Sequence, residues 1–265
     1  MDTNANNNRE SFEDQQVIFV DTHLIQKAVE GLQRAREEFQ TLLEQAEGGD
    51  ASVYYDLGVR YTEGDGTDKD PAQAARWFAL ASEDGDLRAT DLLGRCYQSG
   101  AGVEKDEARA AELFQQAAEQ GHSYAQYALG KLLLSDDMEV RNPAEGIRWL
   151  KTAAQSGNDY AAYRLGKEYY RGKNIERSFT AAAKWFGRAA DQENQYAQYM
   201  LGKLYLMGQG VEYDKSMGIH WLTKSAVQGN VYAESLLQQQ NSGRPPNVFL
   251  GVTRLLNHMG RIFQE

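Results

Sequence analysis

Residues 89–121 read ATDLLGRCYQSGAGVEKDEARAAELFQQAAEQG, and they contain every part of a unit that recurs along the chain. The Leu-Gly dipeptide in this stretch returns at an unbroken interval of 36 residues, with its leucines at Leu57, Leu93, Leu129, Leu165 and Leu201. A second column with the same interval holds a bulky apolar residue at Phe78, Phe114, Leu150, Phe186 and Leu222. Chance does not keep several columns in register over five units. The sequence therefore predicts five tandem 36-residue repeats over residues 50–230.

Each unit contains two helical patterns. In the first, apolar residues recur every four positions, as at Ala89, Leu93 and Tyr97. The glycine after each leucine is a poor residue for the middle of a helix, so its recurrence indicates close approach by a neighbouring helix. The second pattern begins where Asp70-Pro71 resembles a helix cap followed by a first-turn proline. An all-α chain of helix–turn–helix units follows from these patterns.

The combined pattern resembles the Sel1-like repeat, a relative of the tetratricopeptide repeat. Its elements are Ala-x-x-x-Leu-Gly-x-x-Tyr, then Gly-x-Gly-Val-x-x-Asp, then Ala-x-x-Trp-Phe/Leu-x-x-Ala-Ala-x-x-Gly. The resemblance implies a right-handed α-α superhelix, or solenoid, that acts as an adaptor between proteins. Two units depart from the glycine loop, the third at Asp136 and Met138 and the fourth at Asn174, so we expect these loops to differ in conformation.

The two ends are expected to differ from the repeats. Residues 1–20 are predicted to be a disordered acidic arm, and residues 21–49 an N-terminal capping helix. Residues 231–265 are predicted to hold half a repeat and a C-terminal capping helix, which could instead dock a partner. Residues 254–263 within this tail are also similar to tails of repeat-bearing, relaxase-type mobilisation proteins of Gram-positive conjugative elements.

Charge and composition exclude several classes of function. The net charge is −10, and residues 1–150 carry 29 acidic and 14 basic residues, whereas residues 151–265 carry 9 acidic and 14 basic residues. Phosphate backbones repel such an acidic protein, so we expect no direct nucleic-acid binding. No apolar run approaches the roughly 20 residues that cross a bilayer, so no membrane insertion is expected. The single Cys96 excludes an internal disulfide, and the absence of a secretory signal pattern favours the cytoplasm.

No motif for catalysis, a metal or a cofactor emerges. The four histidines, His23, His122, His220 and His258, lie too far apart for metal-ligand spacing. The glycines at Gly208 and Gly210 lack the Lys-Ser/Thr of a phosphate-binding loop. We therefore predict no catalytic, metal-binding or cofactor-binding residues and a protein that is not an enzyme.

Three columns of the first helix of each unit are predicted to face away from the packed stripe. In the third, fourth and fifth units these columns hold tyrosine, tyrosine and lysine, namely Tyr124, Tyr127 and Lys131, then Tyr160, Tyr163 and Lys167, then Tyr196, Tyr199 and Lys203. Stacked helical repeats bind partners on their extended concave surface, and tyrosine suits interfaces. We expect this surface to bind a protein or peptide segment, with the lysines favouring an acidic one. The alternative is that the tyrosines pack between neighbouring repeats.

The preferred function is a non-catalytic scaffold or adaptor for protein–protein interaction. An accessory protein of a conjugative element is one alternative. A homo-oligomer is another, in which the acidic front of one molecule meets the basic back of the next. A hydrolase is a third, since some secreted relatives of the repeat have been proposed to be hydrolytic, but those carry many paired cysteines and this chain has one.

Overall fold

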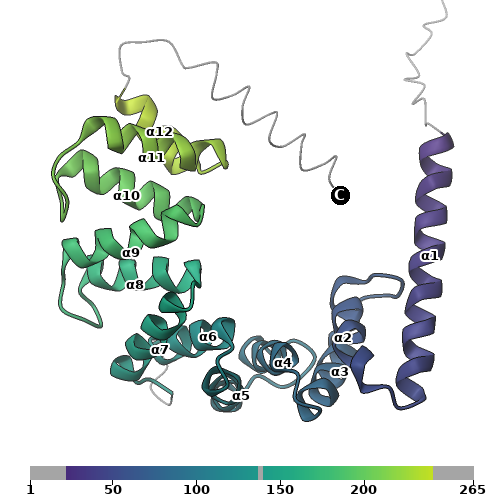
Figure 1. The fold of residues 1–265 in the computed structure, drawn as a ribbon. Helices are drawn as coiled ribbons and strands as arrows, with labels where there is room; N and C mark the ends of the chain where they lie inside the picture. Colours follow the sequence, from purple (N-terminus) through teal and green to yellow (C-terminus); the bar gives the residue numbers. More distant parts are fainter. Residues whose placement is uncertain (1–21, 137–139, 241–265) are drawn as a thin grey trace, which may run out of the picture.

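The computed structural model describes residues 22–136 and 140–240, and within these ranges the chain contains helices and turns but no strand. Figure 1 shows the helices stacked in chain order along an open arc. Their bounds are α1 (Thr22–Glu47), α2 (Tyr54–Glu63), α3 (Pro71–Glu83), α4 (Leu87–Ser99), α5 (Glu107–Glu119), α6 (Ser123–Leu133), α7 (Pro143–Gln155), α8 (Asp159–Arg171), α9 (Phe179–Asp191), α10 (Gln195–Met207), α11 (Lys215–Val227) and α12 (Val231–Gln240), with a 3-10 turn at Ala51–Val53.

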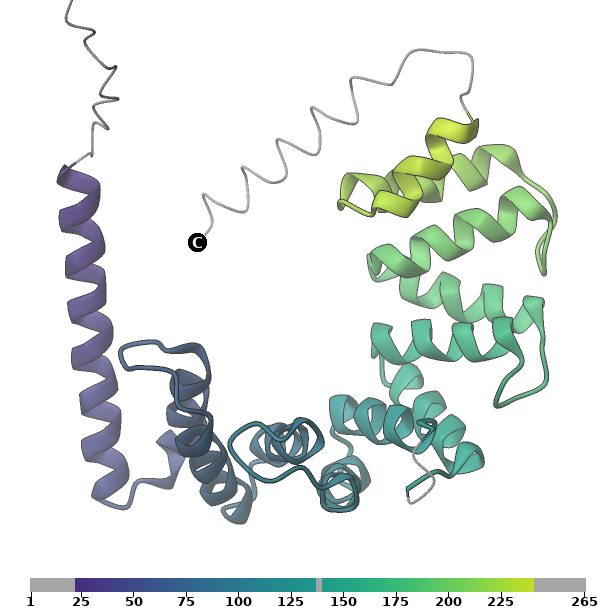
Figure 2. The same ribbon diagram turned by 180° about the vertical axis from the view of Figure 1, so that it is seen from behind.

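Each repeat is a pair of adjacent helices, from α2 with α3 to α10 with α11, and every pair packs on the next. The first helices of the pairs, α2, α4 and α6, lie toward the inside of the arc, and the second helices lie toward its outside (Figures 1 and 2). The all-α solenoid predicted from the 36-residue interval is confirmed.

Side-chain caps and left-handed glycines set the helix ends. The Asp70 carboxylate accepts hydrogen bonds from the backbone N–H groups of Ala72 and Gln73 at the start of α3. The first helices end differently, since Gly100 takes a left-handed φ of 75° after α4 and the equivalent Gly208 a φ of 62° after α10. A residue with a Cβ is strained in that conformation, so this glycine column fixes where the first helix stops.

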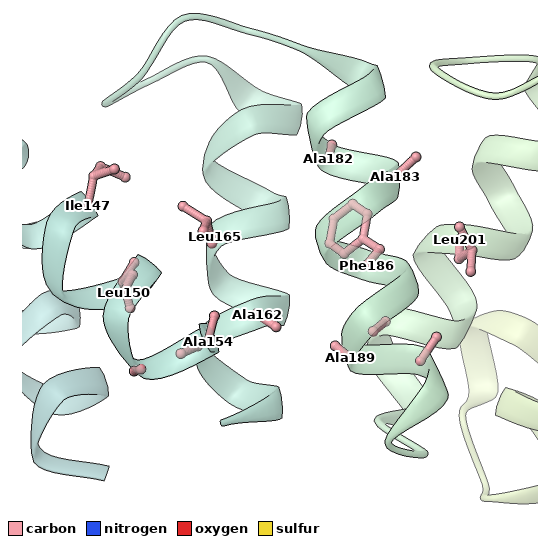
Figure 3. Close-up of a cluster of buried hydrophobic side chains, with 14 of the residues drawn as sticks. Ile147, Leu150, Ala154, Ala162, Leu165, Ala182, Ala183, Phe186, Ala189 and Leu201 are labelled. Atoms are coloured by element: carbon pink, nitrogen blue, oxygen red, sulfur yellow. The ribbon is translucent and has the colours of Figure 1, made fainter. Parts of the chain in front are cut away.

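The glycine of the Leu-Gly pair lets the two helices of a unit touch. A Cβ placed on Gly94 would lie 2.6 Å from Cε1 of Phe114, and one on Gly166 would lie 2.6 Å from Cδ1 of Phe186. The phenylalanine ring thus rests on the glycine backbone. Figure 3 shows Phe186 in a buried cluster with Leu165, Leu150 and several alanines.

Units that carry leucine in place of this phenylalanine compensate with a second glycine. In the third unit a Cβ on Gly146 would lie 3.0 Å from the Gly130 carbonyl oxygen and 3.0 Å from Cγ of Leu134. The fifth unit repeats this arrangement with Gly202 and Gly218. Where leucine replaces the phenylalanine, the two backbones come closer and an additional leucine fills the space.

The loop of the fourth unit departs from those of the first, second and fifth units at the position where the sequence departs, and the equivalent residue of the third unit, Met138, lies outside the described residues. In the second unit Gly102 has a φ of 76° and its Cα lies so close to Pro71 that a Cβ would overlap the Pro71 carbonyl. At the equivalent position Asn174 does not have a positive φ. Its side chain accepts a hydrogen bond from Nη2 of Arg141 at 3.1 Å and donates one to Oε2 of Glu168 at 2.9 Å. In the fourth unit, hydrogen bonds of the Asn174 side chain therefore take the place of the close backbone contact that Gly102 makes with Pro71 in the second unit.

The first helix has two different halves. Gly66 approaches Ala35 of α1 in the way that Gly102 approaches Pro71, which lies 36 residues after Ala35. The second half of α1 thus occupies the place of a second repeat helix, with Phe39 and Ala46 buried. The first half exposes Leu24, Ile25, Val29 and Leu32. The capping role of α1 remains a prediction. The predicted arm at 1–20, the predicted C-terminal capping helix beyond residue 240 and the mobilisation-like stretch at 254–263 lie outside the described residues.

Candidate partner-binding surface

Three exposed tyrosines mark the starts of the first helices of the last three units, α6, α8 and α10. Each is the second residue of its helix, and Tyr124, Tyr160 and Tyr196 expose 52%, 51% and 49% of their surface. The helix cap just before each tyrosine fixes its position. Asn158 and Asn194, for example, accept hydrogen bonds from the N–H groups of Ala161 and Ala197. The three rings therefore repeat in equivalent places.

The second tyrosine column is half-buried and joins consecutive units. The ring centroids of Tyr127 and Tyr160 are 6.2 Å apart, and those of Tyr163 and Tyr196 are 6.0 Å apart. Tyr199 continues the series with Tyr232 of α12 at 6.1 Å. Burial raises the pKa of both Tyr127 and Tyr163 above the ordinary tyrosine value. The two columns form one ladder in which each half-buried ring supports an exposed ring of the next unit.

The three lysines lie beside this ladder. Lys131 is exposed, whereas Lys167 and Lys203 are half-buried, with Nζ 5.4 Å from the ring centroid of Tyr163 and 6.0 Å from that of Tyr170. Burial lowers the pKa of Lys167 below the ordinary lysine value, and repulsion by Arg171 and Arg164 adds to the effect. None of the three lysines forms an ion pair within residues 22–136 and 140–240.

A buried glutamate escaped the sequence analysis. Glu168 is 2% exposed; its Oε1 forms an ion pair with Arg164 Nε at 3.0 Å, and its Oε2 accepts a hydrogen bond from Asn174 Nδ2 at 2.9 Å. Its carboxylate thus lies inside the fold and holds Asn174, which in turn accepts a hydrogen bond from Arg141 in the loop of the third unit. The available signal was a single acid in a column that otherwise holds Arg60, Cys96, Leu132 and Leu204.

The same inner columns have another chemistry in the first two units. The Arg88 guanidinium lies 4.0 Å from the ring centroid of Tyr55, where later units pair two tyrosines. Asp91 takes the place of the half-buried tyrosine and is 5% exposed. Its Oδ2 accepts a hydrogen bond from Arg95 Nε at 3.0 Å, and its Oδ1 has no hydrogen-bond partner. The tyrosine ladder is therefore interrupted at Asp91.

The described residues contain no group of three or more His, Cys, Asp or Glu that could hold a metal ion. His122 serves the fold, since its Nδ1 accepts a hydrogen bond from the N–H of Ala125 at 3.2 Å. His220 lies against the ring of Trp221 at 5.4 Å, and His258 lies outside the described ranges. Within those ranges, no helix is long and apolar enough to span a membrane.

Comparison with known proteins identifies the repeat. The profile of the Sel1 repeat matches residues 51–86, 88–122, 123–158, 159–194 and 195–230. No curated protein sequence matches the chain.

Solved structures share the fold. A protective antigen of uropathogenic Escherichia coli that displays an SLR fold superposes with a TM-score of 0.69 at 27% identity, over 90% of this chain and 56% of the antigen. This chain therefore spans little more than half of that relative. A Sel1 repeat protein from Oxalobacter formigenes gives a TM-score of 0.69 at 24% identity, over 91% of this chain and 96% of its own. A Sel1 repeat protein from Klebsiella pneumoniae gives 0.51 at 23% identity, over 76% and 98%.

Proposed function

The chain belongs to the Sel1 repeat family, whose members typically act as scaffolds for protein–protein interaction, and from this premise we propose that it is a non-catalytic adaptor. Its partner segment lies along the inner surface of the third, fourth and fifth units. This surface, the tyrosine–lysine surface, consists of Tyr124, Tyr127, Lys131, Tyr160, Tyr163, Lys167, Tyr196, Tyr199 and Lys203.

The observation that carries the proposal is the threefold repetition of half-exposed tyrosines on rigid helix starts. A tyrosine ring offers a large contact area and a polar tip, and few rotatable bonds are immobilised when it binds. The rings of Tyr127 and Tyr163 hold the exposed rings of Tyr160 and Tyr196 in place. This preorganisation reduces the entropy that is lost on binding.

The three lysines indicate which charge the partner segment carries. Lys131, Lys167 and Lys203 lie at one edge of the ladder, and no described carboxylate pairs with them. Desolvation makes the Lys167 ammonium group costly, and repulsion by Arg171 and Arg164 exceeds the attraction of Glu168, so the pKa of Lys167 is lowered. A partner carboxylate would remove that cost, so the segment is acidic.

Charge reversal tests the proposal. Lys131→Glu, Lys167→Glu and Lys203→Glu are combined in one variant, and its affinity for a copurifying partner is measured by titration calorimetry. We expect affinity to fall at least tenfold, because three attractive contacts become repulsive. The matched control reverses three cations of the outer helices, Arg148→Glu, Lys184→Glu and Lys224→Glu, with the same change in net charge. The control should bind within about twofold of the unaltered protein, and equal affinities for all three proteins contradict the proposal.

The uneven charge supports self-association as a second candidate. Residues 1–150 carry a net charge of −15 and residues 151–265 a net charge of +5, so the front of one molecule attracts the back of another. Salt screens such attraction, with a Debye length of about 10 Å at 0.1 M and about 3 Å at 1 M. Sedimentation at both salt concentrations separates the candidates, because a charge-driven assembly dissociates at 1 M and an adaptor keeps its sedimentation coefficient.

The adaptor is placed in the cytoplasm, because a lone cysteine such as Cys96 gives no support to a disulfide-stabilised extracellular protein. Fractionation of the cells that make the protein tests this location.

A further inference from the structure

An apolar pocket of about 470 Å³ opens between the inner helices α2 and α4. Phe78 and Ala74 of α3 line it, together with Val59 of α2 and Leu92 of α4. Tyr55 and Arg95 also line it, and they belong to the columns that hold the tyrosines and lysines of later units. The pocket is therefore continuous with the inner surface on which the proposed partner lies.

Small residues in two columns leave this space unfilled. Thr62 stands where the third and fifth units have Leu134 and Leu206. Cys96 stands where those units have the fully buried Leu132 and Leu204. Thr62 and Cys96 both line the pocket. Thr62 and Cys96 are smaller than the leucines in these two columns, and the space that they line is open.

The chemistry of the pocket suits a large apolar side chain. Its volume lies within the roughly 300–1,000 Å³ of ligand sites, and carbon-rich side chains form most of its wall. The Tyr55 and Phe78 rings lie 6.2 Å apart, and Arg88 stacks on Tyr55 at 4.0 Å, so the aromatic part of the wall is held in place. Such preformed pockets accept the anchor residues that contribute most to protein–protein affinity.

We infer that this pocket binds one large apolar side chain, aromatic or branched aliphatic, of the same partner segment that lies on the tyrosine–lysine surface. The inference rests on the proposed function and adds a specificity determinant to it. The partner would carry an apolar anchor toward the α2 end of the groove and acidic residues toward the α10 end.

Two variants fill the pocket with the packing that the chain uses elsewhere. Cys96→Leu copies the columns of Leu132 and Leu204. Thr62→Leu with Ala74→Gly copies the Leu134–Gly146 and Leu206–Gly218 pairs, and it provides a second test if Cys96→Leu lowers stability. Cys96→Ala leaves the pocket open and is the matched control. Thermal unfolding confirms that each variant folds.

The probe is a library of random dodecapeptides displayed on phage and selected on the full chain. We expect the selected peptides to share a large apolar residue and acidic residues. They should bind both filled variants about tenfold more weakly and Cys96→Ala within about twofold of the unaltered protein. A bound peptide should also slow alkylation of Cys96 by iodoacetamide.

The outcomes separate this inference from the proposed function. Peptides that are weakened by the triple lysine reversal but bind the filled variants normally overturn the pocket and leave the adaptor intact. If the triple lysine reversal and the filled variants all bind the peptides normally, the pocket and the adaptor are both overturned. A selection that yields no binder also overturns both proposals.

Discussion

The first two repeats and the last three share one interior but present different inner surfaces. Phe114 of the second unit and Phe186 of the fourth are both fully buried, and each rests on the glycine of its Leu-Gly pair. On the inner surface, however, the front has the Asp91–Arg95 ion pair and an open apolar pocket, and the back has a continuous tyrosine ladder. Packing between units constrains the interior columns, and the adaptor proposal assigns the surface columns to a partner. The surface columns differ between the first two units and the last three units, so these columns are where function should be sought.

The largest expected effect tests whether the interiors are equivalent. Phe114→Ala and Phe186→Ala should each lower the free energy of unfolding by about 3–5 kcal/mol, since each removes a fully buried ring and leaves a cavity. Urea unfolding of the full chain, followed by circular dichroism, measures both. A difference of more than about 2 kcal/mol between the variants would show that the front and back interiors are not equivalent.

A reciprocal exchange tests whether the surfaces differ as described. Tyr127→Asp should lower the free energy of unfolding by about 2 kcal/mol, because it removes the ring that supports Tyr160 and buries a carboxylate. Asp91→Tyr should raise it by about 1 kcal/mol, because it extends the ladder toward Tyr124 and removes the unpaired Oδ1. The same urea experiment measures both changes. If Asp91→Tyr lowered the free energy of unfolding as much as Tyr127→Asp does, the ladder could not be extended through position 91.

The smallest effect is the coupling between rings. A double-mutant cycle of Tyr163→Ala and Tyr196→Ala should give a coupling energy of about 0.5–1.5 kcal/mol, because the rings lie 6.0 Å apart. The equivalent front pair, Asp91→Ala and Tyr124→Ala, should give a value near zero. Equal coupling at both places would show that the ring contact contributes nothing specific to the back units.

The 36-residue interval was enough to predict the helix pairs, the stacking and the close approach at the Leu-Gly glycines. These features repeat, and repetition makes them visible in one sequence. The pocket, the buried Glu168 and the Leu134–Gly146 compensation were not predicted, because each depends on how side chains from two helices share one volume. The sequence did show Cys96 and Glu168 in a column where two other units have leucine. It did not show whether a departure leaves a cavity, recruits a hydrogen bond or is filled by a neighbour.

The pairing of the two tyrosine columns also required the structure. The sequence alone leaves burial between repeats and partner binding as alternatives for these tyrosines. One column is half-buried and the other exposed, so the burial of Tyr163 accompanies the exposure of Tyr196. The assignment of this surface to a partner remains a prediction.

Site-specific photo-cross-linking in living cells tests that assignment most directly. A photoreactive phenylalanine derivative replaces Tyr124, Tyr160 or Tyr196 on the inner helices, and Lys184 on the outer helix α9 serves as the control. The account predicts that the three inner positions cross-link to the same protein and that position 184 does not. Equal cross-linking from position 184, or none from any inner position, would contradict it.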